Sequence, residues 1–443
     1  MRVRVTATAS TTAQAIPPAT EPTTAPAPAP ASSVARRGVR RAACAAVCAV
    51  VCTALLLSGC SASSSSTSST SSSRSSTSSD RSAGDGRDRP KGTAARKNGD
   101  TAPFSGRSGA PGRPVPRGKG GRLPDDFNGD GHRDLVLNDL VRAPGDTYGE
   151  DGGIGIVYGT AAARGLDPAV RQLLSPRKHG ARVDGTLPAA FDAEAACDLD
   201  GDGFGDLIVA TDPPYDGIGA PPVPLQILFG GPDGLGARGT GGGDGTGARA
   251  VVLLIPTDAR AGNEWPDHPV CGDFDGDGAT DLAVTASAGQ VSYLRGPFSR
   301  TGAPRAASAP IPGGGPVLEA PAPKADVNGD GYDDLLHHTW ARTPGGAAKG
   351  GLLLGGPEGP TREGGAYRFK AVRFPTPPRL PSESGRAVTE LLSTAEFTGD
   401  PGGDERQDLV TRTHRGQRTD LIALYASGAG RPVITFSTSI FLG

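Results

Sequence analysis

The sequence is poor in the residues that build the commonest catalytic centres. Its 443 residues include only six histidines, and none of them lies in an H-E-x-x-H pattern. A G-x-S-x-G nucleophile turn and a phosphate-binding P-loop are also absent from the sequence. The adjacent pair His337 and His338 would point to opposite faces of a strand, so a shared metal ion is not expected there. We therefore predict no catalytic residues.

Long apolar runs are scarce as well. The run at residues 42–57 is short for a membrane span, and it follows four arginines between residues 36 and 41. It ends in Leu57-Ser58-Gly59-Cys60, which resembles the lipobox of bacterial lipoproteins, in which the cysteine carries the lipid. We expect residues 1–59 to be an N-terminal extension with a lipoprotein signal peptide and Cys60 to be lipidated. The rest of the chain would then be anchored to a membrane on the outside of the cytoplasm, at the cell surface. An uncleaved anchor helix is the alternative.

Positive charge is scarce in the second part of the chain. Residues 1–121 carry 17 Lys and Arg against 5 Asp and Glu, whereas residues 122–443 carry 28 basic against 42 acidic side chains. An acidic folded part argues against nucleic acid as a partner. Residues 60–121 are rich first in Ser and Thr and then in Gly, Arg and Pro, so they cannot bury apolar area. We predict a disordered tether over residues 60–121 and a folded domain over residues 122–443.

The folded part contains one acidic pattern four times without gaps. It reads D-x-[DN]-G-D-G-x-x-D-L in loops one to four, which begin at Asp126, Asp198, Asp273 and Asp326 and whose nine positions end at the last aspartate of the pattern. At roughly 5 Å and an effective dielectric constant of about 20, each charged pair in such a loop costs on the order of 3 kcal/mol. A bound cation would offset this repulsion. The alternative is a set of acidic, glycine-rich turns that hold no ion.

The spacing of the oxygen atoms favours calcium. Side-chain oxygens at positions 1, 3, 5 and 9 and a backbone carbonyl at position 7 would surround a hard cation, with a glycine at position 6 for the sharp turn. No Cys or His side chain takes part, which argues against zinc. Position 12 lacks the Glu of helix–loop–helix calcium sites and an apolar, β-prone run follows position 9, so each loop should join two strands. About four calcium ions are expected. The predicted ligands are Asp126, Asn128, Asp130, His132 and Asp134 in loop one; Asp198, Asp200, Asp202, Phe204 and Asp206 in loop two; Asp273, Asp275, Asp277, Ala279 and Asp281 in loop three; and Asp326, Asn328, Asp330, Tyr332 and Asp334 in loop four.

A second pattern alternates with the acidic loops. Segments such as "QILFGGPDGLG" and "LLLGGPEGP" are apolar strands that end in a glycine turn. One unit therefore reads strand, acidic loop, strand, linker, strand, glycine turn, strand, which predicts an all-β repeat of four-stranded propeller blades. A fifth, decayed acidic loop lies near Glu396. It cannot align both Asp400 and the pair Asp404 and Asp408 with the pattern, so we expect a blank site there.

The combination of acidic loops and glycine turns resembles the FG-GAP, or VCBS-type, repeats of integrin α-subunit propellers and their bacterial relatives. The resemblance covers about residues 122–443. It implies a β-propeller in which a hairpin loop of each blade binds calcium. Propellers of this family usually have seven blades, but the repeat intervals here favour five recognisable blades over a seven-bladed ring. Loops two and three have four aspartates each, so we expect them to bind calcium more tightly than loops one and four, where Asn replaces one Asp.

Two cysteines remain in the folded part. Cys197 and Cys271 stand one and two residues before the first aspartate of loops two and three. These offsets point to opposite faces of a strand, so we interpret them as two small buried residues. A disulfide bond stays open as an alternative for an exported protein.

Three functions compete at this stage. We favour a surface-tethered, calcium-binding β-propeller that acts as a binding or adhesion module for a protein or a glycan. One alternative is an extracytoplasmic hydrolase or lyase, for which Glu264, Glu319 and Glu390 are carboxylates outside the loops. The other is a purely structural envelope lipoprotein. Trp265 and Trp340 would serve recognition in the first hypothesis, or pack between blades in the last.

Overall fold

A computed structural model of the chain describes residues 112–140, 153–162, 164–236, 250–322, 324–339, 350–368, 388–398, 407–414 and 420–441. All of them belong to the compact unit that includes Asp100–Gly443. The predicted signal peptide, the lipidation site Cys60 and residues 60–111 of the predicted tether lie outside the described residues. Within the described ranges, no helix has the length and apolar character needed to cross a membrane.

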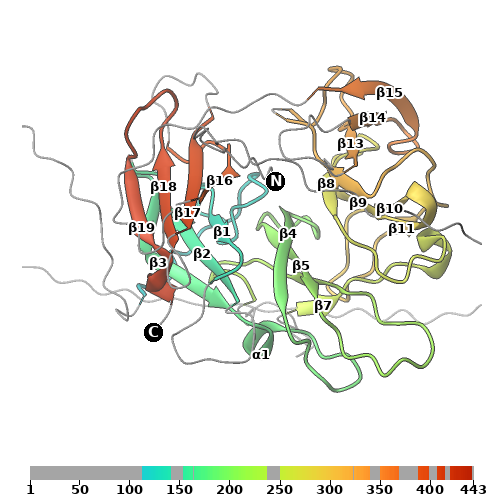
Figure 1. Ribbon diagram of the computed structural model, residues 1–443, viewed down its shortest axis with the longest axis horizontal. Coiled ribbons are helices and arrows are strands. Elements are labelled where there is room, and N and C mark those ends of the chain that lie inside the picture. Colours follow the sequence, from blue (N-terminus) through green and yellow to red (C-terminus); the bar gives the residue numbers. More distant parts are fainter. Residues whose placement is uncertain are drawn as a thin grey trace, which may run out of the picture. The chain divides into compact units, whose positions relative to one another are not determined.

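The described residues form five antiparallel sheets in which consecutive strands are hydrogen-bonded neighbours (Figure 1). The strands are β1 (Leu135–Leu137), β2 (Ile154–Gly159) and β3 (Leu166–Leu174) in sheet one; β4 (Phe191–Cys197), β5 (Asp206–Thr211), β6 (Leu225–Leu228) and β7 (Ala250–Val252) in sheet two; β8 (Val270–Gly272), β9 (Asp281–Thr285), β10 (Val291–Arg295) and β11 (Ala306–Ala307) in sheet three; β12 (Val317–Glu319), β13 (Leu335–His338), β14 (Gly350–Leu354) and β15 (Arg362–Tyr367) in sheet four; and β16 (Val388–Ser393), β17 (Leu409–His414), β18 (Asp420–Tyr425) and β19 (Ile434–Ser437) in sheet five. Short helical turns are α1 (Pro176–His179), η1 (Thr257–Arg260), η2 (Ser287–Gly289) and η3 (Thr438–Phe441). The predicted all-β class is confirmed.

The order of elements within a sheet follows the predicted repeat unit. In sheet two, β4 leads into loop two, β5 leaves it, β6 pairs with β5, and the glycine turn at residues 229–236 follows β6. The strands that leave loops two and three, β5 and β9, continue from their first aspartate as apolar runs without alternation, and all five residues of β9 are buried. A continuous apolar run is typical of a strand covered on both faces. Sheets two to five have the expected four strands, and the described part of sheet one has three.

Buried side chains fill the spaces between successive sheets. Sheet one packs on sheet two, sheet two on sheet three, and sheet three on sheet four, each pair through its own apolar cluster. Sheet five packs on sheet one, which it meets through β17–β19 and η3 (Figure 1). Each cluster takes members from both of its sheets, for example Ile156 and Val209, Ile227 and Leu282, Tyr293 and Leu335, and Leu137 and Leu424. The succession is propeller-like, but no buried cluster of described residues joins sheet four to sheet five, so a closed ring is not shown.

A disulfide bond between Cys197 and Cys271 crosses the interface of sheets two and three, contrary to the interpretation favoured from the sequence. Cys197 ends β4 and Cys271 is the middle residue of β8, and their Cα atoms are 6.4 Å apart. The two cysteines lie on strands of different sheets, so opposite offsets along the two strands do not keep their side chains apart. Two stacked sheets present opposite faces to each other, so side chains of opposite parity on equivalent strands meet in the same interface.

Residues 112–121, which the sequence analysis assigned to the tether, lie across loops one and two as an N-terminal strap. The N–H of Gly118 donates to the carbonyl of Asn128 at 3.0 Å, and the N–H of Gly121 donates to that of Gly203 at 2.6 Å. A Cβ atom at Gly118 would lie 1.9 Å from loop-one backbone, so only glycine allows this approach. Composition missed the strap because backbone hydrogen bonds and two arginine–aspartate ion pairs hold it, with Val115 as its one apolar residue against the cluster of sheets one and two. The folded part therefore includes these residues.

A buried arginine of sheet five, which forms an ion pair within that sheet, also joins it to sheet one. Arg412 on β17 is 2 % exposed, and its Nε donates to the Oδ2 atom of Asp420, the first residue of β18, at 2.6 Å. Its Nη1 and Nη2 atoms donate to the carbonyls of Asn138 and Asp139, which follow β1, at 2.7 and 2.6 Å. His414 also contacts Asp420 at 3.3 Å, and this carboxylate is the largest of the causes that raise the pKa of His414 to about 9. We call Arg412, Asp420 and His414 the sheet-five clasp.

Candidate metal centres

The four acidic loops are joined to strands, as the sequence predicts. They lead directly into β1, β5, β9 and β13, and loops two and three connect adjacent strands of one sheet. In every loop the glycines at positions 4 and 6 have positive φ angles, which only position 6 was expected to need. These glycines are Gly129 and Gly131, Gly201 and Gly203, Gly276 and Gly278, and Gly329 and Gly331. Two left-handed residues in so short a segment fold the loop back on itself.

The carboxylate at position 1 closes each loop from within. Asp198 accepts backbone N–H hydrogen bonds from Gly201, Asp202 and Gly203 at 2.8, 3.1 and 2.8 Å. In the other three loops the position-1 aspartate likewise accepts the N–H of the position-6 glycine, at 2.8 to 3.1 Å. The first aspartate is thereby held over the turn, where the next acidic side chains of the loop also converge.

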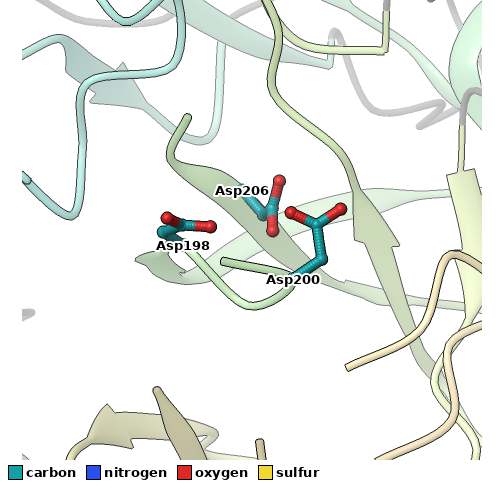
Figure 2. A group of neighbouring side chains, drawn as sticks. All are labelled: Asp198, Asp200 and Asp206. Atoms are coloured by element: carbon teal, nitrogen blue, oxygen red, sulfur yellow. The ribbon is translucent and has the colours of Figure 1, made fainter. Parts of the chain in front are cut away.

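Loop two gathers three carboxylates around one point. Asp198, Asp200 and Asp206 each offer an oxygen atom, and the three atoms lie within 4.8 Å of one another. Figure 2 shows the Asp206 carboxyl group between those of Asp198 and Asp200. The side chain of Asp200 is only 7 % exposed, and its Oδ1 atom is buried without a hydrogen-bond partner. Because an unpartnered buried carboxylate oxygen is costly, this arrangement fits a cation ligand.

Loop three gathers a slightly different set. Asp273, Asp275 and Asp277, at positions 1, 3 and 5, bring one oxygen each within the same 4.8 Å limit. The Oδ1 atom of Asp273 is again buried and unpartnered. Asp281 at position 9 is not part of this cluster, and its oxygens accept hydrogen bonds from the Tyr293 hydroxyl at 2.7 Å and from the N–H of Gly296 at 2.9 Å. The two loops with four aspartates are thus the two that form clusters among the described residues.

Loops one and four use their asparagines differently. The amide nitrogen of Asn128 donates to Asp130 at 2.9 Å and to the strap carbonyl of Pro116 at 2.8 Å. The amide nitrogen of Asn328 donates to Asp330 at 3.0 Å. Their amide N–H groups therefore offset part of the charge repulsion. The predicted ligands of these two loops are not gathered into a cluster of three acidic groups in the described residues, and their cation binding stays a prediction.

The aspartate at position 9 has a role that the sequence analysis missed. In loop two, Asp206 is fully buried, and its two oxygens accept the N–H of Leu199 at position 2 and the N–H of Gly230 in the glycine turn, at 3.0 and 2.8 Å. The same two-sided contact recurs in loops one and four and in the decayed fifth loop, through Asp134, Asp334 and Asp408. Position 9 therefore fastens each acidic loop to the glycine turn of its own sheet. The sequence did contain a signal for this contact, because an acidic loop and a glycine turn recur together in each repeat.

Each of loops one to three also touches the next sheet. The position-2 carbonyl accepts a backbone N–H from the glycine turn of the following sheet, at 2.7 to 3.0 Å. The donor and acceptor pairs are Gly231 with Phe127, Phe298 with Leu199, and Gly356 with Phe274. Phe127, Leu199 and Phe274 are 0 % exposed, whereas Val327 at position 2 of loop four is 47 % exposed. An acidic loop is therefore a junction between two sheets, and loop four is the exposed exception.

Arginines lie on the carboxylate at position 5 in three loops. Arg300 pairs with Asp202 at 2.5 Å and also with Asp200, while Arg305 and Arg362 pair with the position-5 aspartates of loops three and four. Burial raises the pKa of Asp200 to about 6, Arg300 opposes this rise, and the neighbouring aspartates add to it. Cation binding at Asp200 would consequently release a proton below about pH 6, because a ligand carboxylate must be ionised.

The sequence also proposed candidate residues outside the four acidic loops. Glu319 and Glu390 each contact a histidine of the adjacent strand at 3.3 Å. Trp265, which the sequence left between recognition and core packing, is 45 % exposed. Trp340, and Asp400 and Asp404 of the decayed loop, lie outside the described residues.

No known protein family matches the chain, and no curated protein is similar enough in sequence to count as a match. The resemblance to FG-GAP repeats accordingly rests on the acidic loops and glycine turns themselves.

Proposed function

We propose that this protein is a calcium-stabilised β-propeller that is held outside the cytoplasm by a lipid anchor and binds a protein or a glycan. The observation that carries the calcium part is the convergence of three carboxylates in each of loops two and three, with a buried, unpartnered oxygen in each. The ring of five blades is part of the proposal. Its support is the succession of four packed interfaces between similar sheets.

The donor set favours calcium over other cations. Every candidate ligand is an oxygen atom, and the loops are backbone turns that can supply six or more such atoms at flexible distances. Calcium bound there would supply positive charge that offsets the repulsion among the aspartates. Magnesium demands a more regular octahedron and gives up its water reluctantly, so loops of this kind favour it less.

The junction role of the loops explains why such binding would stabilise the whole domain. Asp206 holds position 2 of loop two to the glycine turn of sheet two, and the Leu199 carbonyl at that position holds the glycine turn of sheet three. An open loop would loosen both contacts. A closed loop keeps two sheets in register, so the expected role of the ion is structural.

Calcium is expected to raise the melting temperature of the full-length chain. With dissociation constants of about 0.1–1 mM, typical of extracellular modules, about 10 mM calcium stabilises by about 1.4–2.7 kcal/mol per site. This corresponds to roughly 2–4 °C per site, because a folded part of about 320 residues has an entropy of unfolding of about 0.7 kcal/mol/K. Thermal unfolding should be recorded in EDTA, in calcium and in magnesium, for the wild type and for Asp200→Ala and Asp275→Ala. Each variant should lose part of the calcium-dependent rise.

Asp408→Ala provides the matched control, because Asp408 makes the position-9 contacts in a loop that we expect to be blank. This variant should be destabilised equally in EDTA and in calcium. A wild type whose melting temperature is the same in EDTA and in calcium, or is raised equally by magnesium, contradicts the calcium proposal.

Trp265 supports the recognition part of the proposal, because a tryptophan exposed on a connection is a suitable contact residue. On an array of glycans and cell-wall polymers in calcium, Trp265→Ala should weaken binding by more than about ten-fold. Ile218→Ala, at another exposed apolar residue, is the control and should leave binding unchanged. Absence of any binding would favour the structural alternative, and release of a cleaved product would favour the hydrolase or lyase.

A further inference from the structure

An arginine of sheet three lies directly on the candidate site of sheet two. Arg300 belongs to the segment between β10 and β11, and its Nε and Nη2 atoms contact Asp200 and Asp202 of loop two. Its guanidinium group also lies over the ring of Phe229, 4.4 Å from the ring centre, at the start of the sheet-two glycine turn. Arg300 thereby contacts three residues of sheet two and its loop, namely Asp200, Asp202 and Phe229. Just before it in the same segment, Phe298 donates its N–H to the carbonyl of Leu199.

The contact engages two of the four aspartates of loop two. A single guanidinium group, that of Arg300, contacts the aspartates at positions 3 and 5 of loop two, whereas in loop three Arg295 contacts Asp275 and Arg305 contacts Asp277. The remaining oxygen of Asp202 accepts the N–H of Phe204 at 3.0 Å. Both oxygens of Asp202 are therefore engaged. Asp200 has one oxygen on Arg300 and the other buried and unpartnered.

We propose that Arg300 is an internal competitor of the divalent cation at loop two, so that calcium gains Asp202 and the second oxygen of Asp200 only when Arg300 is released. This inference rests on the proposed calcium binding. Arg300 then lowers the calcium affinity of loop two below that expected from its four aspartates. It also links occupancy of this loop to the contact between sheets two and three.

Release of Arg300 is feasible without separating the sheets. The side chain is half-exposed, so water can replace its ion pairs at small cost. The Cys197–Cys271 disulfide and the apolar cluster between sheets two and three remain in place when the guanidinium moves. The expected change is therefore confined to Arg300 and its own turn.

The first test is a calorimetric calcium titration of the full-length wild type, Arg300→Gln and Arg300→Lys. Loss of one exposed competing ion-pair group should tighten binding at one site about five-fold, equivalent to about 1 kcal/mol. Lysine keeps the charge but cannot make the two-pronged contact, so Arg300→Lys should also tighten binding, by less. Arg431→Gln, at an exposed residue between β18 and β19, is the charge control and should leave every site unchanged.

The second test follows the arginine itself. Wild-type chain is treated with phenylglyoxal in EDTA, calcium or magnesium, and modification of each arginine is read by peptide mass spectrometry. Calcium should make Arg300 more reactive and leave Arg117 of the strap unchanged. Saturable calcium binding with unaltered Arg300 reactivity, or with affinities equal in wild type and Arg300→Gln, overturns this inference alone. Absence of calcium binding in the wild type overturns the proposed function together with it.

Discussion

Arg412→Leu is expected to lower the free energy of unfolding by about 3–5 kcal/mol, because it takes from a buried carboxylate one of its two cationic partners, the other being His414. Asp420 is 0 % exposed, and burial alone would raise its pKa. Instead His414 and Arg412 hold that pKa below its ordinary value. The substitution also removes the donors to the carbonyls of Asn138 and Asp139, so the junction of sheets five and one loses its polar contacts. Urea unfolding of the full-length chain measures the effect.

The double variant Arg412→Leu/Asp420→Asn separates the buried charge from the lost contacts. It also removes the negative charge of Asp420, which the single variant leaves buried with His414 as its remaining cationic partner, so it should recover part of the lost stability. Arg431→Gln serves as a surface control and should change the free energy of unfolding by less than about 0.5 kcal/mol. A cost below about 1 kcal/mol for Arg412→Leu would show that the clasp does not hold the two sheets together.

Removing the disulfide is the second change with a large expected effect. The double variant Cys197→Ala/Cys271→Ala should lose about 2–4 kcal/mol, since the bond closes a loop between residues 74 positions apart. The measurement is urea unfolding of the full-length wild type and variant, each with and without dithiothreitol. Reductant should lower the wild type to the level of the variant and leave the variant unchanged.

Alkylation gives the independent check on the bond. If iodoacetamide modifies both Cys197 and Cys271 in the folded, unreduced chain, the two residues are free thiols and the expected loss disappears. Because the bond spans sheets two and three, the destabilised variant should also show faster hydrogen exchange in β4 and β8 than in β17.

The repeat was predictable from the sequence because its determinants are local. The aspartate and glycine spacing of loop two fixes a turn within nine residues, and the apolar run of β5 follows at once. Such short-range patterns repeat with the fold and can be counted directly. Short-range patterns also predicted that each loop joins two strands. They distinguished loops two and three by their four aspartates, and these two loops form the carboxylate clusters.

The missed features depend on contacts between residues that are far apart in the chain. Asp206 meets Gly230 across 24 residues, and Arg300 meets Asp202 across 98. Arg412 meets Asn138 across 274 residues. The disulfide was missed for the related reason that face parity within one strand does not say which faces of two stacked sheets meet. Strand positions alone carry no information on such pairings.

The N-terminal strap determines how the domain would respond to mechanical load. Any pull on the chain before residue 112 reaches the strap first. Arg113 forms a parallel bridge with Val170 on the edge strand β3, and its side chain pairs with Asp167. The bridge is isolated and has one backbone hydrogen bond, from the N–H of Arg113 to the carbonyl of Ala169, which would share the load with the ion pair of Arg113. Tension from the N-terminal side would therefore be borne by β3 and by loops one and two before it reaches the buried strands of any sheet.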